Sequence, residues 1–355
     1  MGGWSQLMLS TNPPGGGDTL LIAPQWIGDA VMTQPLIAAL QAQGQRITVG
    51  ALPWVAPVYR AMAEVHRVIA FPFAHGGLQW TARRQLAKEL RGQFQRAVVC
   101  PNSFKSALLP WWAGIEHRIG YQGEARYGLL TQALTNPPKH ARGSMVAHYL
   151  ALAGGANLAA PAPPHPVLHV HADALAAALQ SEKLQAHAYY VFAPGAEYGP
   201  AKRWPVAHFA DLARGLDAPV LLLGSAKDAP MCEEIVALAN RGAAGPCTSL
   251  AGRAGLDLAL SLVAGARAVV SNDSGLMHVA AALGRPQVAL FGSSSPLHTP
   301  PLSDVARVLW LKNDPAYQPP LDCAPCFARD CPLGHTRCLR DLSPGMAAQA
   351  LAGLL

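Results

Sequence analysis

The stretch SNDSGLMHVAAALG, residues 271–284, follows an apolar run and leads into a helical pattern. A strand, a polar turn and a helix start therefore form one unit, in which Asp273 or Ser274 can cap the helix and Gly275 removes side-chain bulk. The free backbone N–H groups and the positive end of such a helix favour a phosphate or another anion. Another apolar run follows at 287–291, so we expect the loop at the carboxyl edge of a parallel sheet, where α/β proteins bind nucleotides.

The same alternation of short apolar runs and helical patterns recurs along the whole chain. Strands are predicted at residues 19–24, 46–51, 97–100, 167–170, 189–193, 220–223, 268–271 and 288–291. Helices are predicted at residues 30–41, 86–90, 106–112, 145–152, 172–184, 231–238 and 346–355, and from residue 206. A chain of 355 residues is long enough for two domains. We therefore predict an α/β protein with two Rossmann-like, doubly wound parallel-sheet domains that face each other across a cleft.

The domain limits follow from changes in composition along the chain. Residues 1–18 contain PPGGG and are expected to form a flexible lead-in. The proline-rich stretch that ends at residue 166 separates a first domain, 19–170, from a second domain, 171–340. Residues 341–355 are expected to form a C-terminal helix, in a position from which it can return to brace the first domain.

Composition excludes several classes of protein. Hydrophobic residues make up 51% of the chain and charged residues 14%, which excludes intrinsic disorder. The net charge of +6 is not concentrated in a basic run, so an anionic substrate or an acidic lipid surface fits better than nucleic acid. Glycines and prolines break the uncharged stretch 143–172, and residues 1–18 lack the features of a secretion signal. Together with an odd number of cysteines, seven, these features predict a cytosolic protein.

Asp29 is the first candidate for catalysis. It ends the loop 25–29 that follows the first predicted strand, and Gly28 before it allows a tight turn toward the cleft. A carboxylate at this edge can deprotonate a hydroxyl group. The alternative is that Asp29 caps the following helix, and the spacing does not decide between the two roles.

The loop PGAEYGPAKRWP, residues 194–205, carries two adjacent cations. Lys202 is a point charge that suits a pyrophosphate, and Arg203 can pair with Glu197. The alternative is that both cations are simply solvated.

Three further side chains have a functional and a structural interpretation. Ser225 can donate to a phosphate or accept from a base or ribose, and Asp228 can bind ribose hydroxyls or cap the next helix, the cap being favoured. His278 lies one helical turn beyond Ser274, where it can face the same ligand or pack as a neutral histidine.

Cys323, Cys326, Cys331 and Cys338, with His335 among them, form a C-x2-C-x4-C-x6-C pattern. The pattern is compact enough to hold zinc but contains only one C-x2-C pair, so reduced thiols packed in a loop are favoured over a metal site. Neither G-x-G-x-x-G after a strand nor G-x-x-x-x-G-K-[ST] is present, which argues against dinucleotide and P-loop sites. D-x-D is also absent, which argues against a metal-bridged sugar nucleotide.

The motifs PQWIGD at 24–29, PGAEYGPAKRWP at 194–205 and NDSGLMH at 272–278 occur in this order along the chain. Taken together, they resemble the ADP-heptose:lipopolysaccharide heptosyltransferases of glycosyltransferase family 9, and within that family the heptosyltransferase II group. CAPC at 323–326 and CPLGH at 331–335 are similar to the C-terminal region of the same group.

The resemblance implies a GT-B fold that transfers L-glycero-D-manno-heptose from ADP-heptose to the first heptose of the lipopolysaccharide inner core, with inversion and without an essential metal. It implies that Asp29 is the general base and that Lys202 binds the diphosphate and stabilises it as it leaves. The implied donor-binding residues are Glu197, Lys202, Ser225, Asp228, Asp273, Ser274, Gly275, Met277 and His278.

The implied acceptor is a heptosylated Kdo-lipid A, met at the cytoplasmic face of the inner membrane by a peripherally attached protein. Lys105, Arg118 and Arg142 are candidate acceptor contacts, with a solvated surface position as the alternative for each. Other interpretations stay open: a GT-B transferase that uses another nucleotide sugar, a paralogous heptosyltransferase that adds the first or a later core heptose, and a non-catalytic glycolipid- or nucleotide-binding module. A dehydrogenase is the weakest of these alternatives.

Overall fold

The computed structural model describes residues 17–73, 77–138, 143–154, 163–241 and 246–355. The expected lead-in lies almost entirely outside these ranges. The strands of the first domain are β1 (Asp18–Ile22), β2 (Arg46–Ala51), β3 (Val65–Ala70), β4 (Arg96–Val99), β5 (His117–Tyr121) and β6 (Gln132–Leu134). Its helices are α1 (Ile27–Met32), α2 (Gln34–Ala42), α3 (Ala56–Arg60), α4 (Trp80–Leu90), α5 (Phe104–Trp112) and α6 (Met145–Leu150).

The second domain repeats the pattern. Its strands are β7 (Tyr190–Ala193), β8 (Val220–Leu222), β9 (Cys247–Ser249), β10 (Ala268–Asn272), β11 (Gln287–Leu290) and β12 (Ala306–Leu309). Its helices are α7 (Ala172–Ser181), α8 (Val206–Arg214), α9 (Ala229–Ala239), α10 (Leu256–Ala264), α11 (Gly275–Ala282), α12 (Arg337–Arg340) and α13 (Pro344–Ala352).

Each domain is built on a six-stranded sheet whose strand pairs are all parallel. The strand order is β3-β2-β1-β4-β5-β6 in the first sheet and β12-β11-β10-β7-β8-β9 in the second. The strand order therefore reverses between β1 and β4 and between β7 and β10. These reversals are the switch points beside which open α/β sheets bind ligands. The predicted fold class, two doubly wound parallel-sheet domains, is confirmed.

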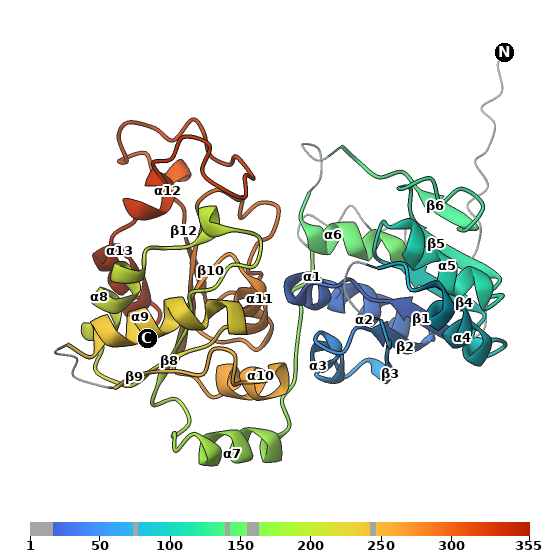
Figure 1. Cartoon of the computed structure of the whole chain (residues 1–355), viewed down its shortest axis with the longest axis horizontal. Helices are drawn as coiled ribbons and strands as arrows, with labels where there is room; N and C mark the ends of the chain where they lie inside the picture. Colours follow the sequence, from blue (N-terminus) through green and yellow to red (C-terminus); the bar gives the residue numbers. More distant parts are fainter. Residues whose placement is uncertain (1–16, 74–76, 139–142, 155–162, 242–245) are drawn as a thin grey trace.

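Apolar strands buried on both faces build the core of each sheet. Every residue of β4, β7, β10 and β11 is buried, and in β1 only the first residue, Asp18, is partly exposed. Figure 1 shows the two domains side by side, with α1 and α11 on the sides that face each other. No helix in the described ranges combines the length and the hydropathy that a membrane span requires.

Two glycines allow α1 and α11 to approach closely. A Cβ atom added to Gly275 would lie 2.7 Å from the Cβ of Ile27, and one added to Gly28 would lie 2.8 Å from the Cδ2 of His278. Real Cβ atoms essentially never come this close to another heavy atom. The contact between the domains therefore requires residues without side chains at both helix starts.

Two predicted elements differ in the structure. Residues 167–170 form no strand; instead the backbone N–H of Leu168 donates to Ala282 O and that of His169 to Ala61 O, which ties this connecting segment to both domains. Helix α13 packs against α8, β11 and β12, and Figure 1 shows it on the outer side of the second domain. Its buried Ala347 and Leu351 belong to the core of that domain, so the expected return to the first domain was wrong.

The glycine contact predicts how the domains respond to one added methyl group. Gly275→Ala forces the new Cβ against Ile27, and overpacking of this kind costs about 1–3 kcal/mol. Because contacts between domains are weaker than domain cores, we expect the domains to move apart and the radius of gyration from small-angle X-ray scattering to increase. Gly345→Ala, whose added Cβ meets nothing closer than 3.7 Å, is the matched control. An unchanged radius in both variants would contradict this account.

Candidate functional site

The polar loops predicted from the sequence gather at the two switch points. In the first domain, Asp29 lies in the first turn of α1, which follows β1, and Lys105 lies in the first turn of α5, which follows β4. In the second domain, the loop after β7 carries Lys202 and the loop after β10 carries Asp273. Because α1 contacts α11, the acid of the first domain faces the charged pair of the second.

Asp29 is the third residue of α1, and Trp26 occupies the N-cap position. The alternative that Asp29 caps the helix is therefore wrong. Its carboxylate lines a cavity and accepts a hydrogen bond of 2.9 Å from the hydroxyl of Tyr149. Its place in the first turn also puts a negative charge near the positive end of the helix.

Opposing influences set the proton affinity of Asp29. Burial raises the pKa of its carboxyl above the ordinary value, and the nearby charge of Asp273 raises it further. The hydrogen bond from Tyr149 and the positive charge of Lys202 both lower this pKa. Asp29 thus responds electrostatically to Asp273 and Lys202 across the domain contact. A raised pKa suits a carboxylate that must take up a proton.

A cavity of about 680 Å³ opens beside Asp29 on the first domain. It lies between the loop after β1, the loop after β4 and α6. The residues that line it are Pro24, Gln25, Trp26, Asp29, Leu78, Cys100, Pro101, Asn102, Ser103, Phe104, Lys105, Glu124, Met145, His148 and Tyr149. This mixture of polar side chains and exposed aromatic rings is typical of a site for an amphipathic or glycosylated ligand.

The three predicted acceptor contacts have different outcomes. Lys105 lines the cavity that contains Asp29. Arg118 does not line it, because its guanidinium donates to the backbone carbonyls of Leu129 and Ile115 and so holds the turn beside β5. We therefore withdraw Arg118 as an acceptor contact. Arg142 lies outside the described residues.

Lys202 and Asp273 form an ion pair at the start of α11. The Nζ of Lys202 lies 2.5 Å from the Oδ2 of Asp273, and 18% of the lysine side chain and 6% of the aspartate side chain are exposed. Thr299 also donates to the other oxygen of Asp273, at 3.4 Å. The solvated alternative for Lys202 is therefore wrong, because the aspartate holds its ammonium group at the domain contact.

The neighbouring Asn272 fixes the loop that carries Lys202. Its Nδ2 donates to Pro194 O at 2.6 Å, and its Oδ1 accepts from the backbone N–H of Trp204 at 3.0 Å. One buried amide thus joins both ends of the loop to β10. The sequence shows only that Asn272 directly follows a predicted strand. It does not show that its side chain binds the loop that carries Lys202.

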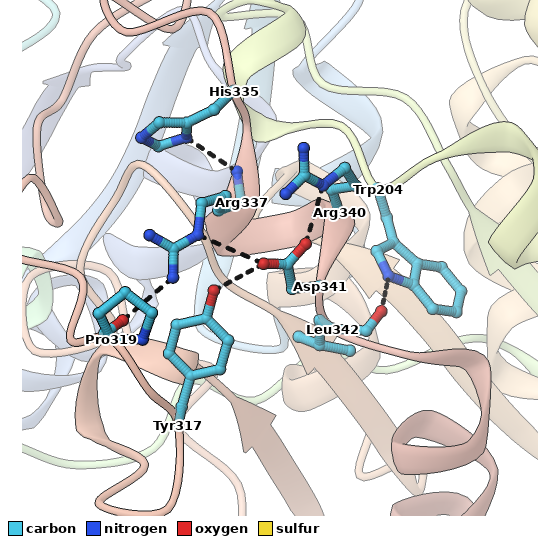
Figure 2. Close-up of polar contacts among 8 residues, drawn as sticks. All are labelled: Trp204, Tyr317, Pro319, His335, Arg337, Arg340, Asp341 and Leu342. Atoms are coloured by element: carbon cyan, nitrogen blue, oxygen red, sulfur yellow. Dashed lines mark hydrogen bonds and ion pairs between the residues drawn. The ribbon is translucent and has the colours of Figure 1, made fainter.

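The segment before α13 supports the same loop from the other side (Figure 2). The indole Nε1 of Trp204 donates to Leu342 O at 2.8 Å. Asp341 directly precedes Leu342, and its carboxylate accepts hydrogen bonds from Tyr317, Arg337 and Arg340. These bonds fix the turn that presents Leu342 O to the tryptophan, so the C-terminal segment helps to position the lysine loop.

Glu197, Ser225 and Asp228 mainly organise the loops around the site. Glu197 pairs with Lys227 at 2.6 Å, and Arg203 lies 3.7 Å from Asp228, so the expected pairing of Arg203 with Glu197 was wrong. Ser225 and Asp228 form a capping box on the short 3-10 turn at 226–228. Asp228 occupies the N-cap position of α9 but makes no side-chain capping bond to it, so the favoured alternative holds for its position only. Their contact with a nucleotide remains a prediction.

The start of α11 separates residues that face the domain contact from residues that face the core. Ser274 occupies the N-cap position without a side-chain capping bond, and Gly275 touches α1. Met277 is fully buried beside Ala289 and Phe291, so we withdraw it as a donor contact. His278 packs against Gly28, and burial lowers its pKa to about 4. It is therefore a neutral hydrogen-bonding group near neutral pH.

The four clustered cysteines line one small cavity of about 20 Å³, together with His335 and Ala201. All seven cysteines of the chain are free thiols. Across the described ranges, no three His, Cys, Asp or Glu side chains are arranged to hold a metal ion. Ala201 N donates to Arg329 O at 3.1 Å within this region, so the cysteine segment is a further support for the lysine loop.

Sequence reasoning missed several residues of the site. Tyr149 is buried and bonds to Asp29 although 120 positions separate them, and only folding brings them together. Asn102 and Glu124 line the same cavity. A polar residue shortly after the predicted strand 97–100 was the available signal for Asn102.

A family model described as glycosyltransferase family 9 (heptosyltransferase) matches residues 83–336, well over half of the chain. The chain belongs to glycosyltransferase family 9. The chain is 45% identical over 305 residues to lipopolysaccharide heptosyltransferase 2 of Escherichia coli K12, and the match covers 82% of this chain and 87% of that protein. It is 39% identical over 351 residues to lipooligosaccharide heptosyltransferase 2 of Haemophilus influenzae. This match covers 95% of this chain and 99% of that protein.

Solved structures agree with the fold of the heptosyltransferase. It matches the ADP-heptose lipopolysaccharide heptosyltransferase II of E. coli with a TM-score of 0.82 and 40% identity, covering 95% of its own chain and 98% of the other. The E. coli heptosyltransferase WaaC, solved with ADP, matches with a TM-score of 0.66 at 18% identity. This match covers 95% of this chain and 100% of that one. The GT-B architecture expected from the motifs is therefore confirmed, and the heptosyltransferase is an enzyme of sugar transfer.

The hydrogen bond between Tyr149 and Asp29 predicts a shift in the pH profile. Tyr149→Phe removes a bond that lowers the pKa of Asp29, so this pKa rises further. The carboxylate form needed to accept a proton then appears only at higher pH. We expect the acidic limb of kcat/KM to move to higher pH, while activity recovers toward the alkaline side. Tyr127→Phe, at an 88% exposed tyrosine, is the control, and a uniform loss at every pH would contradict the positioning role.

Proposed function

We propose that the protein transfers L-glycero-D-manno-heptose from ADP-heptose to the first heptose of the lipopolysaccharide inner core, with inversion at the anomeric carbon. The observation that carries this proposal is the meeting of Asp29 with the pair formed by Lys202 and Asp273 across the contact of two domains. Identity of 39–45% with proteins named heptosyltransferase 2 supports the choice of substrates.

In the proposed reaction, Asp29 acts as the general base. Its carboxylate takes the proton from an acceptor hydroxyl held in the 680 Å³ cavity. The resulting oxygen attacks the anomeric carbon of the donor heptose, and the bond from that carbon to the diphosphate oxygen breaks. Because attack and departure occur on opposite faces, the configuration inverts and ADP leaves with the bonding electrons. Tyr149 keeps the carboxylate aimed at the cavity.

The charges of the second domain stabilise the leaving diphosphate. Lys202 supplies a cation, and the start of α11 supplies backbone N–H groups at the positive end of a helix. His278, neutral near pH 7, is suited to donate or accept a hydrogen bond. These groups perform the charge neutralisation that many sugar-nucleotide enzymes assign to a metal ion. We therefore propose transfer without an essential metal.

The proposed acceptor is a heptosylated Kdo-lipid A, which is anchored in a membrane. An enzyme that reaches it must work at the lipid surface, and we place this one peripherally at the cytoplasmic face of the inner membrane. The net charge of +6 supports contact with an anionic glycolipid and an acidic surface. Lys105 beside the cavity is the basic residue proposed to meet acidic groups of the acceptor.

The role of Asp29 predicts a loss of rate without a loss of fold. Asp29→Asn keeps the size and shape of the side chain but removes its basicity, and loss of a general base typically lowers rate by about 10²-fold to 10⁴-fold. We expect this loss in kcat, with the KM for ADP-heptose and the melting temperature near those of the parent protein. Asp304→Asn, at an exposed aspartate of the second domain, is the matched control. Unfolding of the Asp29→Asn variant would instead assign Asp29 a structural role.

The role of Lys202 predicts how the nucleotide binds. Lys202→Met removes the charge but keeps a side chain of similar length. We expect ADP affinity, measured by calorimetry, to fall roughly tenfold or more, which is the usual contribution of a charge-assisted hydrogen bond.

The proposed metal independence predicts that addition of EDTA to the parent protein changes neither ADP affinity nor turnover. Loss of turnover with EDTA would refute metal independence, and competition by UDP as strong as by ADP would favour a different nucleotide sugar.

A further inference from the structure

Helices α4 and α5 of the first domain, with the residues just before α4, expose an unusual set of large apolar side chains. Leu78 is 42% exposed, Trp80 47%, Phe104 39% and Trp111 46%. Phe104 and Trp111 lie seven residues apart on α5 and therefore share one face of that helix. We call these four residues the aromatic face. Figure 1 shows α4 and α5 on the side of the first domain that is remote from the second.

The two helices hold the aromatic face together through Trp112, which lies half-buried between them. The ring of Trp80 packs edge-on against Trp112 with centroids 4.6 Å apart. The guanidinium of Arg84 lies 5.8 Å from the Trp112 ring, and Arg91 donates to Trp112 O at 3.5 Å. The exposed ring of Trp80 is thus supported by Trp112, which also contacts the cation of Arg84.

Exposed cations lie beside this face. Residues 77–116 contain six Lys and Arg, of which Arg83 and Arg96 are buried. Arg84 and Lys88 are exposed on α4 and Arg91 at its end, beside the exposed acids Glu89 and Glu116. Glu124 is also exposed and accepts a hydrogen bond of 2.8 Å from the backbone N–H of Phe104. Tryptophan rings together with cations are typical of protein surfaces that lie at the interface between water and lipid.

The aromatic face is continuous with the mouth of the catalytic cavity. Leu78 and Phe104 belong to both, and Lys105 lies beside Phe104 in the cavity lining. Arg83 joins the two helix starts, since its guanidinium donates to Leu78 O at 2.7 Å and to Lys105 O at 3.4 Å. A molecule that extends from the cavity past these residues reaches the exposed rings of α4 and α5.

We propose that the aromatic face is the surface with which the protein rests on an anionic lipid bilayer. The inference rests on the proposed function, because an acceptor anchored in lipid must enter the cavity from the side that touches the membrane. The rings of Trp80 and Trp111 enter the interfacial region, and the cations of α4 bind anionic headgroups. Leu78 and Phe104 then lie where the sugar chain of the acceptor passes from the headgroups into the cavity.

A second copy of the chain fits this face less well. A symmetric dimer would bury the exposed cations of α4 in an interface, and interface cores are depleted of lysine. An anionic bilayer instead satisfies the rings and the charges together, so it is the occupant that this chemistry favours.

Vesicle binding tests the proposal without relying on catalysis. The full chain should float with vesicles of phosphatidylcholine and phosphatidylglycerol, bind pure phosphatidylcholine more weakly, and dissociate as salt rises. The double variant Arg84→Gln/Lys88→Gln should bind about 25-fold more weakly, at about fivefold per charge. The double variant Trp80→Ser/Trp111→Ser should lose at least roughly tenfold.

Matched controls place equivalent changes outside the face. Arg307→Gln removes an exposed cation, and Leu297→Ser removes a 74% exposed apolar side chain, both in the second domain. Both controls should bind vesicles like the parent protein. The proposal is overturned if the parent protein does not bind anionic vesicles, if the face variants bind as well as the controls, or if light scattering shows that the tryptophans mediate dimerisation.

Turnover separates this inference from the proposed function. With a water-soluble heptosylated acceptor that lacks acyl chains, the face variants should keep the kcat of the parent protein. With the acylated acceptor in vesicles, their rate should fall in proportion to vesicle binding. Vesicle binding without any heptose transfer would refute the proposed function alone, whereas transfer that is indifferent to the face variants in vesicles would refute the aromatic face alone.

Discussion

The approach of two helix starts is the constraint on which the rest of the site depends. Gly28 and Gly275 add no side chain of their own between α1 and α11, so His278 packs directly on Gly28 and Ile27 directly on Gly275. Each helix carries charged groups to the same place, Asp29 from one domain and Asp273, paired with Lys202, from the other. A larger residue at either glycine would separate the acid from the cation, whatever the identity of the remaining side chains.

Electrostatics links the two halves of the proposed reaction. Burial and Asp273 raise the pKa of Asp29, and Lys202 lowers it. Under the proposed function, a bound diphosphate neutralises part of the lysine charge and so strengthens Asp29 as a base when the donor is present. Tyr149 opposes an excessive rise, because its hydrogen bond stabilises the carboxylate. The base is therefore adjusted by groups from both domains.

The sequence predicted those parts of the molecule in which function and local pattern coincide. Buried parallel strands read as apolar runs, and Asp29, Lys202 and Asp273 could be found because they lie in the polar segments that connect such runs to the next helix. Strands rich in charged or polar residues, such as β3 (VHRVIA) and β5 (HRIGY), lacked this signal and were missed.

Other details depend on tertiary contacts that no local pattern records. Tyr149 reaches Asp29 only after α6 packs beside α1. Met277 and His278 are neighbours in the sequence, but the helix turns one toward the core and the other toward the facing domain. The sequence presents Arg118 as a surface cation. In the fold, its guanidinium instead donates to backbone carbonyls, which no local pattern records.

The most direct measurement of the central claim is a crystal structure of the protein with ADP bound. The account predicts diphosphate oxygens within hydrogen-bond distance of Lys202 Nζ and of the backbone N–H groups at the start of α11, on the side of the second domain that faces Asp29. Nucleotide bound within the first domain, or a diphosphate bound out of reach of Lys202 with Asp29 turned away from it, would contradict the claim that one gap between the domains holds both groups.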